Sequence, residues 1–391
     1  MHISELNELQ FRNYSNIHTG KNYEQSVEYA TLEESKGYKK LFLALMDEQN
    51  NVHAATLILE KNINNKHKTG FIPSGYLLNY FNTGLLEIFT KELKSYLRKH
   101  NYIYIKLNPL INYQIYNSDF ILLENNTNII NNFKKIGYEY IENTSKYKMV
   151  ISNNDINNTF SNFKRSLRRN INDCLKKGIT VYKGTEKDID IFLELIEDKD
   201  YYQKMIQIFN NPNNSFEFYI AKLNPENYIN NYRYLLKNEQ IKNEKLNKKL
   251  NDASTKKTNN LIDKKITSDK LINKYNKEII NGTNIYKDYP NGIPISTVGI
   301  IANQKQITFI TEGYKNEFKY IRSISLIKWE IIKKHLVENY QTFDLGDISI
   351  SNNYTSKAGF NGNIIEYSNT FDLPINEMLY KINNFNKKQS K

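Results

Sequence analysis

The sequence predicts an α/β protein of the α+β type with two domains, the second of which is interrupted by a pair of long helices. Short apolar runs typical of strands alternate with stretches of helical periodicity along most of the 391 residues. Hydrophobic residues make up 39% of the chain, which is enough for two cores. Residues 226–281 differ, because their apolar positions follow a helical period throughout. We therefore predict a first domain over residues 1–150, a second over residues 151–391, and a helical hairpin over residues 226–281 inserted in the second.

Strand and helix patterns alternate through the first domain. Asn22–Ser26 precedes a helix that extends to Leu32, and a turn at residues 49–51 separates two strands. The pattern predicts strands over Leu41–Leu45, Val52–Leu59, Tyr102–Leu107 and Gly137–Tyr140. It predicts helices over Leu85–His100 and Asn125–Lys135. Strands that alternate with helices around a mixed sheet are typical of an N-acetyltransferase-like domain.

A basic segment opens the second domain. Phe163–Asn170 contains Arg168 and Arg169 and leads into a helix that ends at Lys177-Gly178. Gly178 is a suitable C-terminal cap, because glycine readily adopts the left-handed conformation that ends many helices. Two interpretations of the arginines remain open: they belong to a solvated basic face, or they hold phosphate groups through bidentate hydrogen bonds.

The helical hairpin carries half of the net charge of the chain. Residues 226–281 contain thirteen Lys or Arg and seven Asp or Glu residues, a net charge of +6 against +12 for the whole chain. A polar stretch over residues 252–260 separates its two apolar stripes. The segment is either a spacer with a solvated face or an arm that guides RNA by counterion release.

Strands and one helix follow the hairpin. Ile295–Ile301 and Ile307–Thr311 predict a pair of strands, and Ser323–Glu338, which contains the single tryptophan, predicts a helix. Phe343–Leu345 and Ile364–Leu373 predict strand, loop, strand at the end of the chain.

The last loop places one cation and one aromatic ring between glycines. Lys357 and Phe360 stand beside Gly359 and Gly362, whose backbone can approach a ligand closely. Spacing alone leaves two interpretations, because short patterns are weak. The segment is a hairpin with a solvated lysine, or it presents an ammonium and a ring to a ligand.

Composition limits the classes of partner and site. The charge of +12 favours polyanions, which include RNA, phosphorylated precursors and an anionic membrane surface. The single cysteine, Cys174, excludes an intramolecular disulfide and a cysteine metal cluster, and the six histidines show no metal-ligand spacing. No apolar run approaches about twenty residues, and no signal peptide is recognisable. We therefore expect a cytoplasmic protein that at most touches the inner face of the membrane.

The C-terminal segment contains a recurring combination of motifs. The strand end is Phe343-Asp344-Leu345-Gly346, and the glycine-bearing loop contains Lys357-Ala358-Gly359-Phe360. The closing segment contains Glu366-Tyr367, Phe371 and Pro374-Ile375-Asn376. This combination resembles the FemABX family, the aminoacyl-tRNA-dependent transferases that build peptidoglycan cross-bridges. Looser similarities extend the resemblance over nearly the whole chain, at Glu24-Gln25-Ser26, Gly37-Tyr38, Lys106-Leu107-Asn108-Pro109, Arg168-Arg169-Asn170, Gly313, Lys319-Tyr320 and Trp329-Glu330.

The chain departs from the family pattern in four places. Ser356 replaces an aromatic residue, Asn108 replaces an acidic residue, and Ser74-Gly75-Tyr76 replaces Arg-Gly-Pro. Near Asp200 the chain lacks a short segment whose arginine the family associates with the precursor diphosphate. An amide has no proton that titrates near neutral pH, so Asn108 cannot serve as a general base.

The resemblance implies roles for particular residues. Lys357 is expected to stabilise charge at the donor ester or the ribose, and Phe360 to pack near the terminal adenosine. Asp347 and Glu366 are the nearest carboxylates that could accept the proton of an attacking amine. Substrate contacts are expected from Tyr38, Gly75, Lys106, Asn108, Arg168, Arg169 and Glu366.

The loop before the Trp329 helix distinguishes two classes of donor. Coenzyme A needs a glycine-bearing loop whose amides hold the pyrophosphate, and Lys319–Ile324 contains no glycine. We therefore expect two acetyltransferase-like domains that transfer an amino acid from aminoacyl-tRNA to the side-chain amine of a peptidoglycan precursor, lipid-linked or nucleotide-linked, without a metal or an organic cofactor. The alternative is a family member with a decayed active site that binds tRNA or another RNA, or that serves assembly.

Overall fold

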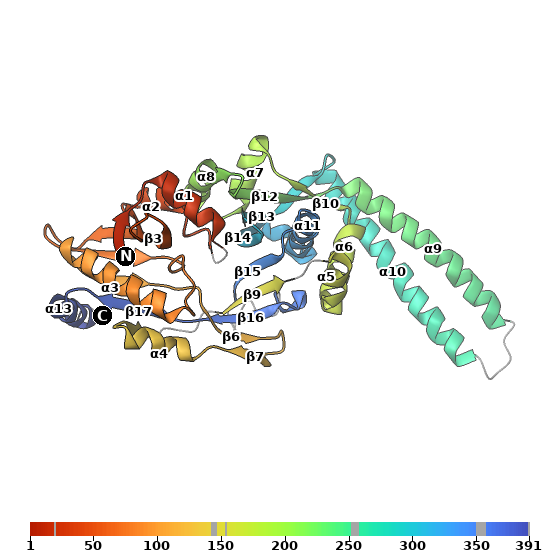
Figure 1. Ribbon diagram of the computed structural model, residues 1–391. Coiled ribbons are helices and arrows are strands. Elements are labelled where there is room, and N and C mark those ends of the chain that lie inside the picture. Colours follow the sequence, from red (N-terminus) through yellow and green to blue (C-terminus); the bar gives the residue numbers. More distant parts are fainter. Residues whose placement is uncertain (19–20, 142–146, 153–154, 252–257, 349–356, 390–391) are drawn as a thin grey trace.

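Two β-sheets form the body of the protein, and a pair of long helices extends from it (Figure 1). The computed structural model describes residues 1–18, 21–141, 147–152, 155–251, 258–348 and 357–389. Ser356, one of the departures from the family pattern, lies outside the described residues.

The first sheet is mixed. In spatial order its described strands are β1 (His2–Glu5), β2 (Lys39–Met46), β3 (Val52–Asn62), β4 (Lys68–Ile72), β5 (Tyr102–Leu107), β17 (Thr370–Pro374) and β8 (Glu139–Ile141). Strands β4 and β5 pair in parallel, and the other described pairs are antiparallel. Helix α3 (Thr83–Lys99) connects β4 to β5, as a parallel pair requires a crossover.

The second sheet carries the larger core. Its described strands run in the order β10 (Ile179–Lys183), β12 (Asn214–Leu223), β13 (Ile293–Asn303), β14 (Gln306–Tyr314), β15 (Thr342–Ile348), β9 (Tyr147–Ser152), β16 (Asn363–Tyr367), β6 (Asn112–Tyr116) and β7 (Leu122–Asn125), with β11 (Asn210–Asn211) beside β12. Its core packs against helices α6 (Arg165–Lys176) and α11 (Ile324–Val337).

The remaining helices cover the sheets and close the chain. They are α1 (Glu8–Ile17), α2 (Val27–Glu34), α4 (Asn128–Lys135), α5 (Ile156–Asn162), α7 (Ile189–Leu195), α8 (Lys199–Ile208) and α13 (Glu377–Gln389), together with the short 3-10 helices η1 (Glu186–Asp188), η2 (Asn316–Ile321) and η3 (Ala358–Phe360).

The predicted strands and helices of the first 150 residues are confirmed, with shifts of a few residues at their ends. Helix α2 begins where Ser26 caps it, since the Ser26 hydroxyl accepts a hydrogen bond from the Tyr29 amide at 3.1 Å. Gly178 has the expected left-handed conformation after α6, with φ +68°. The glycine signal therefore located the end of α6 correctly, and α2 starts directly after Asn22–Ser26 as predicted.

The C-terminal segment does not form the simple hairpin that its spacing allowed. Strand β9 lies between β15 and β16 and pairs with both. The stretch Ile364–Leu373, expected as one strand, is divided between β16 in the second sheet and β17 in the first. Hydrophobicity along the chain could not show this, because partners for these strands come from residues more than 200 positions away.

Each half of the chain contributes strands to the sheet of the other half. Strands β6 and β7 come from the first 150 residues and lie in the second sheet, whereas β17 comes from the C-terminal end and lies in the first. The boundary at residue 150 stays a prediction, and the two sheets are joined by more than one connection.

A buried carboxylate also joins the two halves. Glu28 of α2 forms an ion pair with Arg12 and accepts a hydrogen bond from Asn214 Nδ2 of β12 at 3.0 Å. Burial alone would raise the pKa of Glu28, but the hydrogen bonds from Asn214 and Arg12 outweigh it and hold the pKa below its usual value. The ionised carboxylate therefore stabilises the contact between α2 and β12.

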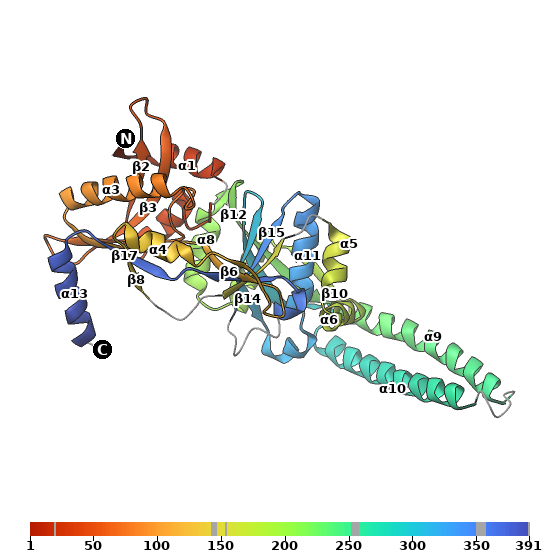
Figure 2. The ribbon, with the colours of Figure 1, turned by 60° about the horizontal axis from the view of Figure 1, so that its bottom comes forward.

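The pair of long helices consists of α9 (Pro225–Asn251) and α10 (Thr258–Asp288), which lie side by side in both views (Figures 1 and 2). Tyr228 and Tyr232 are buried where the pair meets the body. Gly282 of α10 permits the close approach there, because a Cβ atom at this position would lie 3.0 Å from Ile229 Cγ1. At 1.5 Å per residue, the 27 residues of α9 span about 40 Å.

Candidate active site

Strands β14 and β15 separate along their length and open a space in the second sheet. They pair in parallel only over Gln306–Thr308 and Thr342–Asp344. Beyond these residues each strand has a bulge against its other neighbour. The bulge of β14 lies at Ile310, opposite Gly299 and Ile300 of β13, and that of β15 lies between Asp344 and Asp347, opposite β9. A β-bulge bends and twists its strand, so neighbouring bulged strands diverge.

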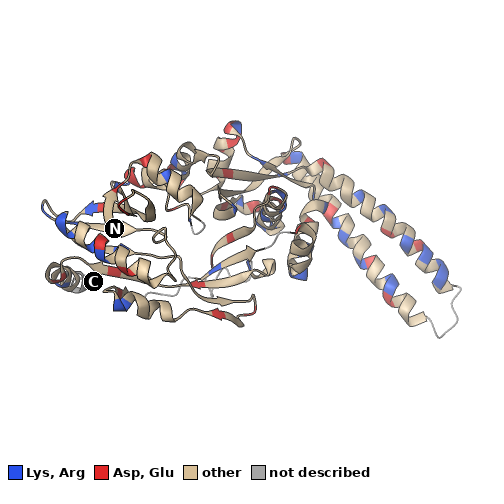
Figure 3. Cartoon of the chain, in the orientation of Figure 1, with Lys and Arg blue, Asp and Glu red and all other residues tan. Residues whose placement is uncertain are grey.

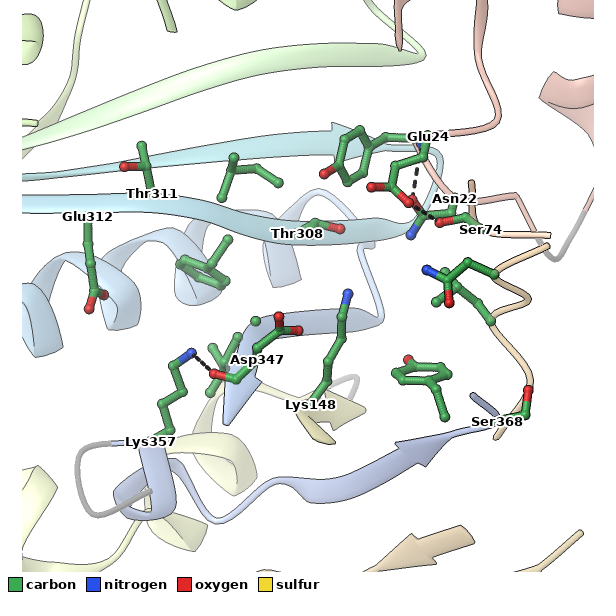
Figure 4. Close-up of a pocket in the computed structure, with 18 of the residues that line it drawn as sticks. Asn22, Glu24, Ser74, Lys148, Thr308, Thr311, Glu312, Asp347, Lys357 and Ser368 are labelled. Atoms are coloured by element: carbon green, nitrogen blue, oxygen red, sulfur yellow. Dashed lines mark hydrogen bonds between the residues drawn. The ribbon is translucent and has the colours of Figure 1, made fainter. Parts of the chain in front are cut away.

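A first cavity of about 560 Å³ lies at this opening (Figure 4). Residues of the first 150 positions form one side of it, namely Asn22, Tyr23, Glu24, Ser74, Asn108 and Leu110. Lys148 also lines the cavity, from β9, which pairs with β15 and β16. The opposite side comes from β14, α11, β15, and the segments that carry Lys357 and Tyr367. The first cavity is therefore built from both halves of the chain.

A second cavity of about 930 Å³ adjoins the first. Its wall includes Ser166 and Asn170 of α6, the segment from Phe318 to Ser325 around the N-terminus of α11, and Phe360. Glu312, Lys328 and Lys357 line both cavities. We call these three residues the junction.

Backbone contacts hold Lys357 and the turn that follows it. Its ammonium donates a hydrogen bond to the Asp347 carbonyl oxygen at 2.7 Å (Figure 4). The following turn is fixed to α6, since the Lys164 amide donates to the Gly359 carbonyl at 2.8 Å. Burial and the neighbouring Lys328 ammonium lower the pKa of Lys357 to about 8.

Lys328 and Glu312 form an ion pair beside Lys357. The Lys328 ammonium of α11 lies 2.7 Å from a Glu312 carboxylate oxygen of β14. Burial alone would raise the pKa of Glu312, but the two lysines outweigh it and hold the pKa below its usual value. The junction therefore combines two cations and one anion within reach of both cavities.

Phe360 forms part of a ring cluster at the second cavity. It is 3% exposed and meets Phe163 edge to face at a centroid distance of 5.2 Å. Phe163 in turn packs against Trp329 of α11. Phe360 thus lines the second cavity, and its contact with an adenosine stays a prediction.

A buried ion pair sits at the base of the first cavity. Lys148 Nζ lies 2.9 Å from a carboxylate oxygen of Asp344, and the Gly346 amide donates to the other oxygen at 2.8 Å. Burial alone would lower the pKa of Lys148, but Asp344 outweighs it and holds the pKa above its usual value. Lys148 stays charged, and its ammonium lies 5.8 Å from the centre of the Tyr367 ring.

The two predicted carboxylates lie in different places. Asp347 is exposed and lines the first cavity (Figure 4). Glu366 is not among the described residues of either cavity wall; its carboxylate accepts a hydrogen bond from Tyr116 at 3.3 Å within the sheet. The substrate contact by Glu366 stays a prediction.

Some of the residues predicted to contact substrate lie on a cavity wall, and others do not. Asn108 and Ser74 line the first cavity, whereas Gly75 is not among the described residues of its wall. Lys106 Nζ lies 3.3 Å from a carboxylate oxygen of Asp372, across β5 and β17. Lys61 Nζ lies over the Tyr38 ring, 5.9 Å from its centre. Arg168 and Arg169 are not among the described wall residues; Ser166, Leu167 and Asn170 of the same helix are.

The segment before α2 was predicted only as a helix entry and forms a wall of the first cavity. Gln25 is fully buried; its amide nitrogen donates to the Pro73 carbonyl at 2.6 Å, and its amide oxygen accepts from the Leu57 amide at 2.8 Å. These bonds hold Glu24 against Ser74, whose hydroxyl donates to it. Strand β3 and two loops therefore fix this wall.

Sequence comparison places this architecture in a known family. Residues 6–388 match the FemAB family. The chain belongs to the FemAB family. Aminoacyltransferase FemA of Staphylococcus epidermidis is 24% identical over 412 residues, which cover 98% of each chain. Aminoacyltransferase FemA of Staphylococcus aureus strain bovine RF122 / ET3-1 is 24% identical over 409 residues, which cover 97% of each chain.

A solved structure has the same fold. The crystal structure of FemX superposes with a TM-score of 0.73 at 17% identity, over 98% of this chain and 99% of that chain. The predicted family and the predicted enzyme class, an aminoacyltransferase, are confirmed by the FemAB match and the FemA relatives.

Two further properties bear on the site. The described residues contain no group of three His, Cys, Asp or Glu side chains that could hold a metal ion. Within the same residues no helix has the length and apolar character needed to cross a membrane.

Proposed function

We propose that this FemAB family member transfers an amino acid from aminoacyl-tRNA to the side-chain amine of a peptidoglycan precursor and so builds an interpeptide bridge. The observation that carries the proposal is the pair of adjoining cavities with a common wall at Glu312, Lys328 and Lys357. A reaction between two large substrates needs two binding spaces that meet at the reacting atoms.

The second cavity suits the 3′ end of the donor. Helix α11 begins at its wall, and a helix N-terminus favours phosphate groups. Lys319 and Arg322 are exposed at the same wall and add positive charge. Phe360 offers an apolar ring for a base or ribose at the end nearest Lys357.

The first cavity suits the acceptor peptide. Its wall is polar on the side of Asn22, Ser74 and Asn108, and these side chains can hydrogen-bond a peptide backbone. The amine to be acylated would approach the junction from this side. No metal or organic cofactor takes part in the proposed reaction.

The chemistry is acyl transfer from an ester to an amine. The neutral amine attacks the ester carbonyl, the carbonyl oxygen becomes an oxyanion, and the bond to the ribose oxygen breaks. The nitrogen loses one proton and the ribose oxygen gains one, so the reaction balances without a cofactor. Lys357, as an ammonium, stabilises the oxyanion or the departing ribose oxygen.

The long helices add a surface for the body of the tRNA. Lys and Arg residues occur along α9 and α10, several of them toward the free end (Figure 3). We assign to this pair the role of an arm inserted in a second acetyltransferase-like domain. Its positive charge would bind the RNA backbone at a distance from the junction.

The test is transfer of radiolabelled amino acids from a charged-tRNA pool to lipid-linked and to nucleotide-linked precursor. We expect label in one precursor, loss of label after ribonuclease treatment, and a decrease on the order of 100-fold in Lys357→Ala. If wild type binds tRNA in a salt-sensitive way but labels neither precursor, the chain is a binding protein and the proposal fails.

A further inference from the structure

The junction contains one carboxylate that sequence analysis did not single out. Glu312 is the one Asp or Glu among the described residues that lines both cavities. It follows the bulge of β14, and Figure 4 shows its side chain directed to the part of the cavity where Lys357 lies. A group bound to Glu312 would therefore lie beside Lys357.

Glu312 has capacity for a second partner. Lys328, which is 5% exposed, occupies one of its oxygens at 2.7 Å, whereas the Glu312 side chain is 48% exposed. An ionised carboxylate accepts about four hydrogen bonds, so one lysine does not saturate it. Its pKa lies below the usual value, and Glu312 is an anion at neutral pH.

The other carboxylates near the junction are placed less well. Asp344 is buried and paired with Lys148, and Glu24 already accepts a hydrogen bond from Ser74. Asp347 lines the first cavity but not the second. Among the described carboxylates, Glu312 alone lines both cavities, where a group from either substrate would meet the common wall.

We propose that Glu312 is the binding residue for a primary ammonium group of a substrate at the junction of the two cavities. This inference rests on the proposed function. Two sources supply such a group: the side-chain amine of the acceptor, and the α-amine of the donor amino acid next to the ester. Both carry a positive charge at neutral pH. The acceptor nitrogen is the atom that attacks the ester carbon, and the donor α-amine is joined to that carbon through Cα.

The assignment is one of binding and not of proton transfer. A carboxylate whose pKa lies below its usual value is a weak base toward an ammonium, so Glu312 orients the group without deprotonating it. An acceptor ammonium held there passes its proton to solvent before the neutral amine attacks the ester. The arrangement places the anion of Glu312 and the cation of Lys357 on the same wall, one for the substrate ammonium and one for the oxyanion.

The principal test is Glu312→Gln, which keeps the shape of the side chain and removes its charge. We expect kcat/KM for transfer to fall on the order of 10- to 100-fold, the loss of one charge-assisted hydrogen bond. Glu194→Gln is the matched control, because Glu194 is an exposed surface carboxylate paired with Lys315 and its loss should leave transfer unchanged.

A second variant separates binding from fold stability. Glu312→Gln leaves Lys328 buried without its counterion, which by itself can destabilise the protein. The double variant Glu312→Gln/Lys328→Gln removes both charges and should recover the melting temperature. We expect it to remain as defective in transfer as Glu312→Gln, whereas a purely structural ion pair predicts recovered transfer.

Two measurements, one for each substrate, identify the source of the ammonium. A KM increase for the precursor alone assigns Glu312 to the acceptor amine. Weaker binding of aminoacyl-tRNA, with equal binding of its N-acetylated form to wild type and variant, assigns it to the donor. Wild-type kcat/KM in Glu312→Gln, or full recovery in the double variant, overturns the inference but leaves the proposed function standing. An inactive wild type overturns both.

Discussion

The environment of Lys357 is set by two opposing effects. Burial and Lys328 favour its neutral form, whereas Glu312 and the nearby aspartates favour its ammonium form. The balance places its pKa at about 8, close to neutral pH. A lysine with this pKa is still mostly charged at pH 7 and can lose its charge within the range in which enzymes are assayed.

The first prediction concerns the pH dependence of transfer. If the Lys357 ammonium stabilises the oxyanion, kcat should fall as the pH rises through about 8, because the charged form is lost. Lys357→Arg keeps a positive charge at every accessible pH, so its falling limb should be absent even if its rate is lower. Initial rates from about pH 6 to about pH 9, corrected for ester hydrolysis without enzyme, measure both profiles. A falling limb of equal position in both proteins would contradict the assignment.

The second prediction concerns Gly346, the residue that turns β15 toward the junction. Its φ is +81°, and a Cβ atom there would lie 3.4 Å from Lys357 Nζ. Gly346→Ala should cost about 1 to 2 kcal/mol of unfolding free energy through backbone strain and should reduce transfer by displacing Lys357. Denaturant unfolding and transfer rates measure the two effects.

Gly84→Ala is the control for that substitution. Gly84 lies at the start of α3 without positive φ, and an added Cβ would meet only Asn82 at 3.8 Å. Alanine there should leave stability equal or raise it by up to about 1 kcal/mol. Equal behaviour of the two variants would show that the conformation of Gly346 does not matter.

At the residue scale, local motifs predicted only part of the junction. Lys357, Phe360, Asp347 and Asn108 stand in recognisable short motifs, and the structure places all four on cavity walls. Glu312 and Lys328 were missed because neither lies in a chemical motif. Lys328 occupies a buried position of an apolar helix face, and a lysine there is a signal that a partner carboxylate must exist.

At the scale of elements, the sequence specified local structure better than strand partners. The apolar runs gave β15, β16 and β17 their extended conformation, but the insertion of β9 between β15 and β16 depends on contacts across the chain. Lys357 lies in the connection between β15 and β16. Its hydrogen bond to the Asp347 carbonyl oxygen joins Lys357 to β15, a contact that local sequence patterns do not specify.

The third prediction concerns the contact between α9 and α10. Asn243 of α9 donates hydrogen bonds to Ser268 at 3.0 Å and to Asp269 at 2.8 Å, and Asn243 and Ser268 are buried between the helices. Asn243→Ala should reduce the local stability of the pair by about 1 to 2 kcal/mol, because it removes both bonds. Hydrogen exchange should accelerate in α9 and α10 and stay unchanged in β12–β14.

An exposed asparagine on α9 provides the control. Asn247→Ala removes the same side chain four residues away, where it faces solvent, so exchange should be unchanged or slower. If Asn243→Ala and Asn247→Ala behave alike, the buried polar contact does not stabilise the pair.

At the scale of the whole molecule, the first cavity depends on how the two halves are held. Strands β6, β7 and β17 cross between the sheets, and Glu28 bonds α2 to β12. The wall at Glu24 and Ser74 belongs to the same segment that leads into α2. The connections between the halves therefore also fix the distance between the two sides of the first cavity. Composition and periodicity predicted two units of α/β structure, but not these exchanges, since they depend on long-range pairing.

The last prediction concerns the charge of the long helices and the proposed tRNA donor. Lys245, Lys248 and Lys249 are exposed in the last turns of α9, about 30 Å from its start at 1.5 Å per residue. Each lysine that contacts a phosphate contributes about 0.7 to 0.9 to the slope of log K against log salt concentration. Replacing all three with Glu should weaken tRNA binding and lower the magnitude of this slope by up to about 2 to 3, without changing transfer at saturating donor.

The control replaces Lys66, Lys91 and Lys187, three exposed lysines of the body, with Glu and makes the same change in net charge. An equal loss of slope in both variants would mean that net charge, and not the position of α9, governs RNA binding, and α9 and α10 would then serve as a spacer.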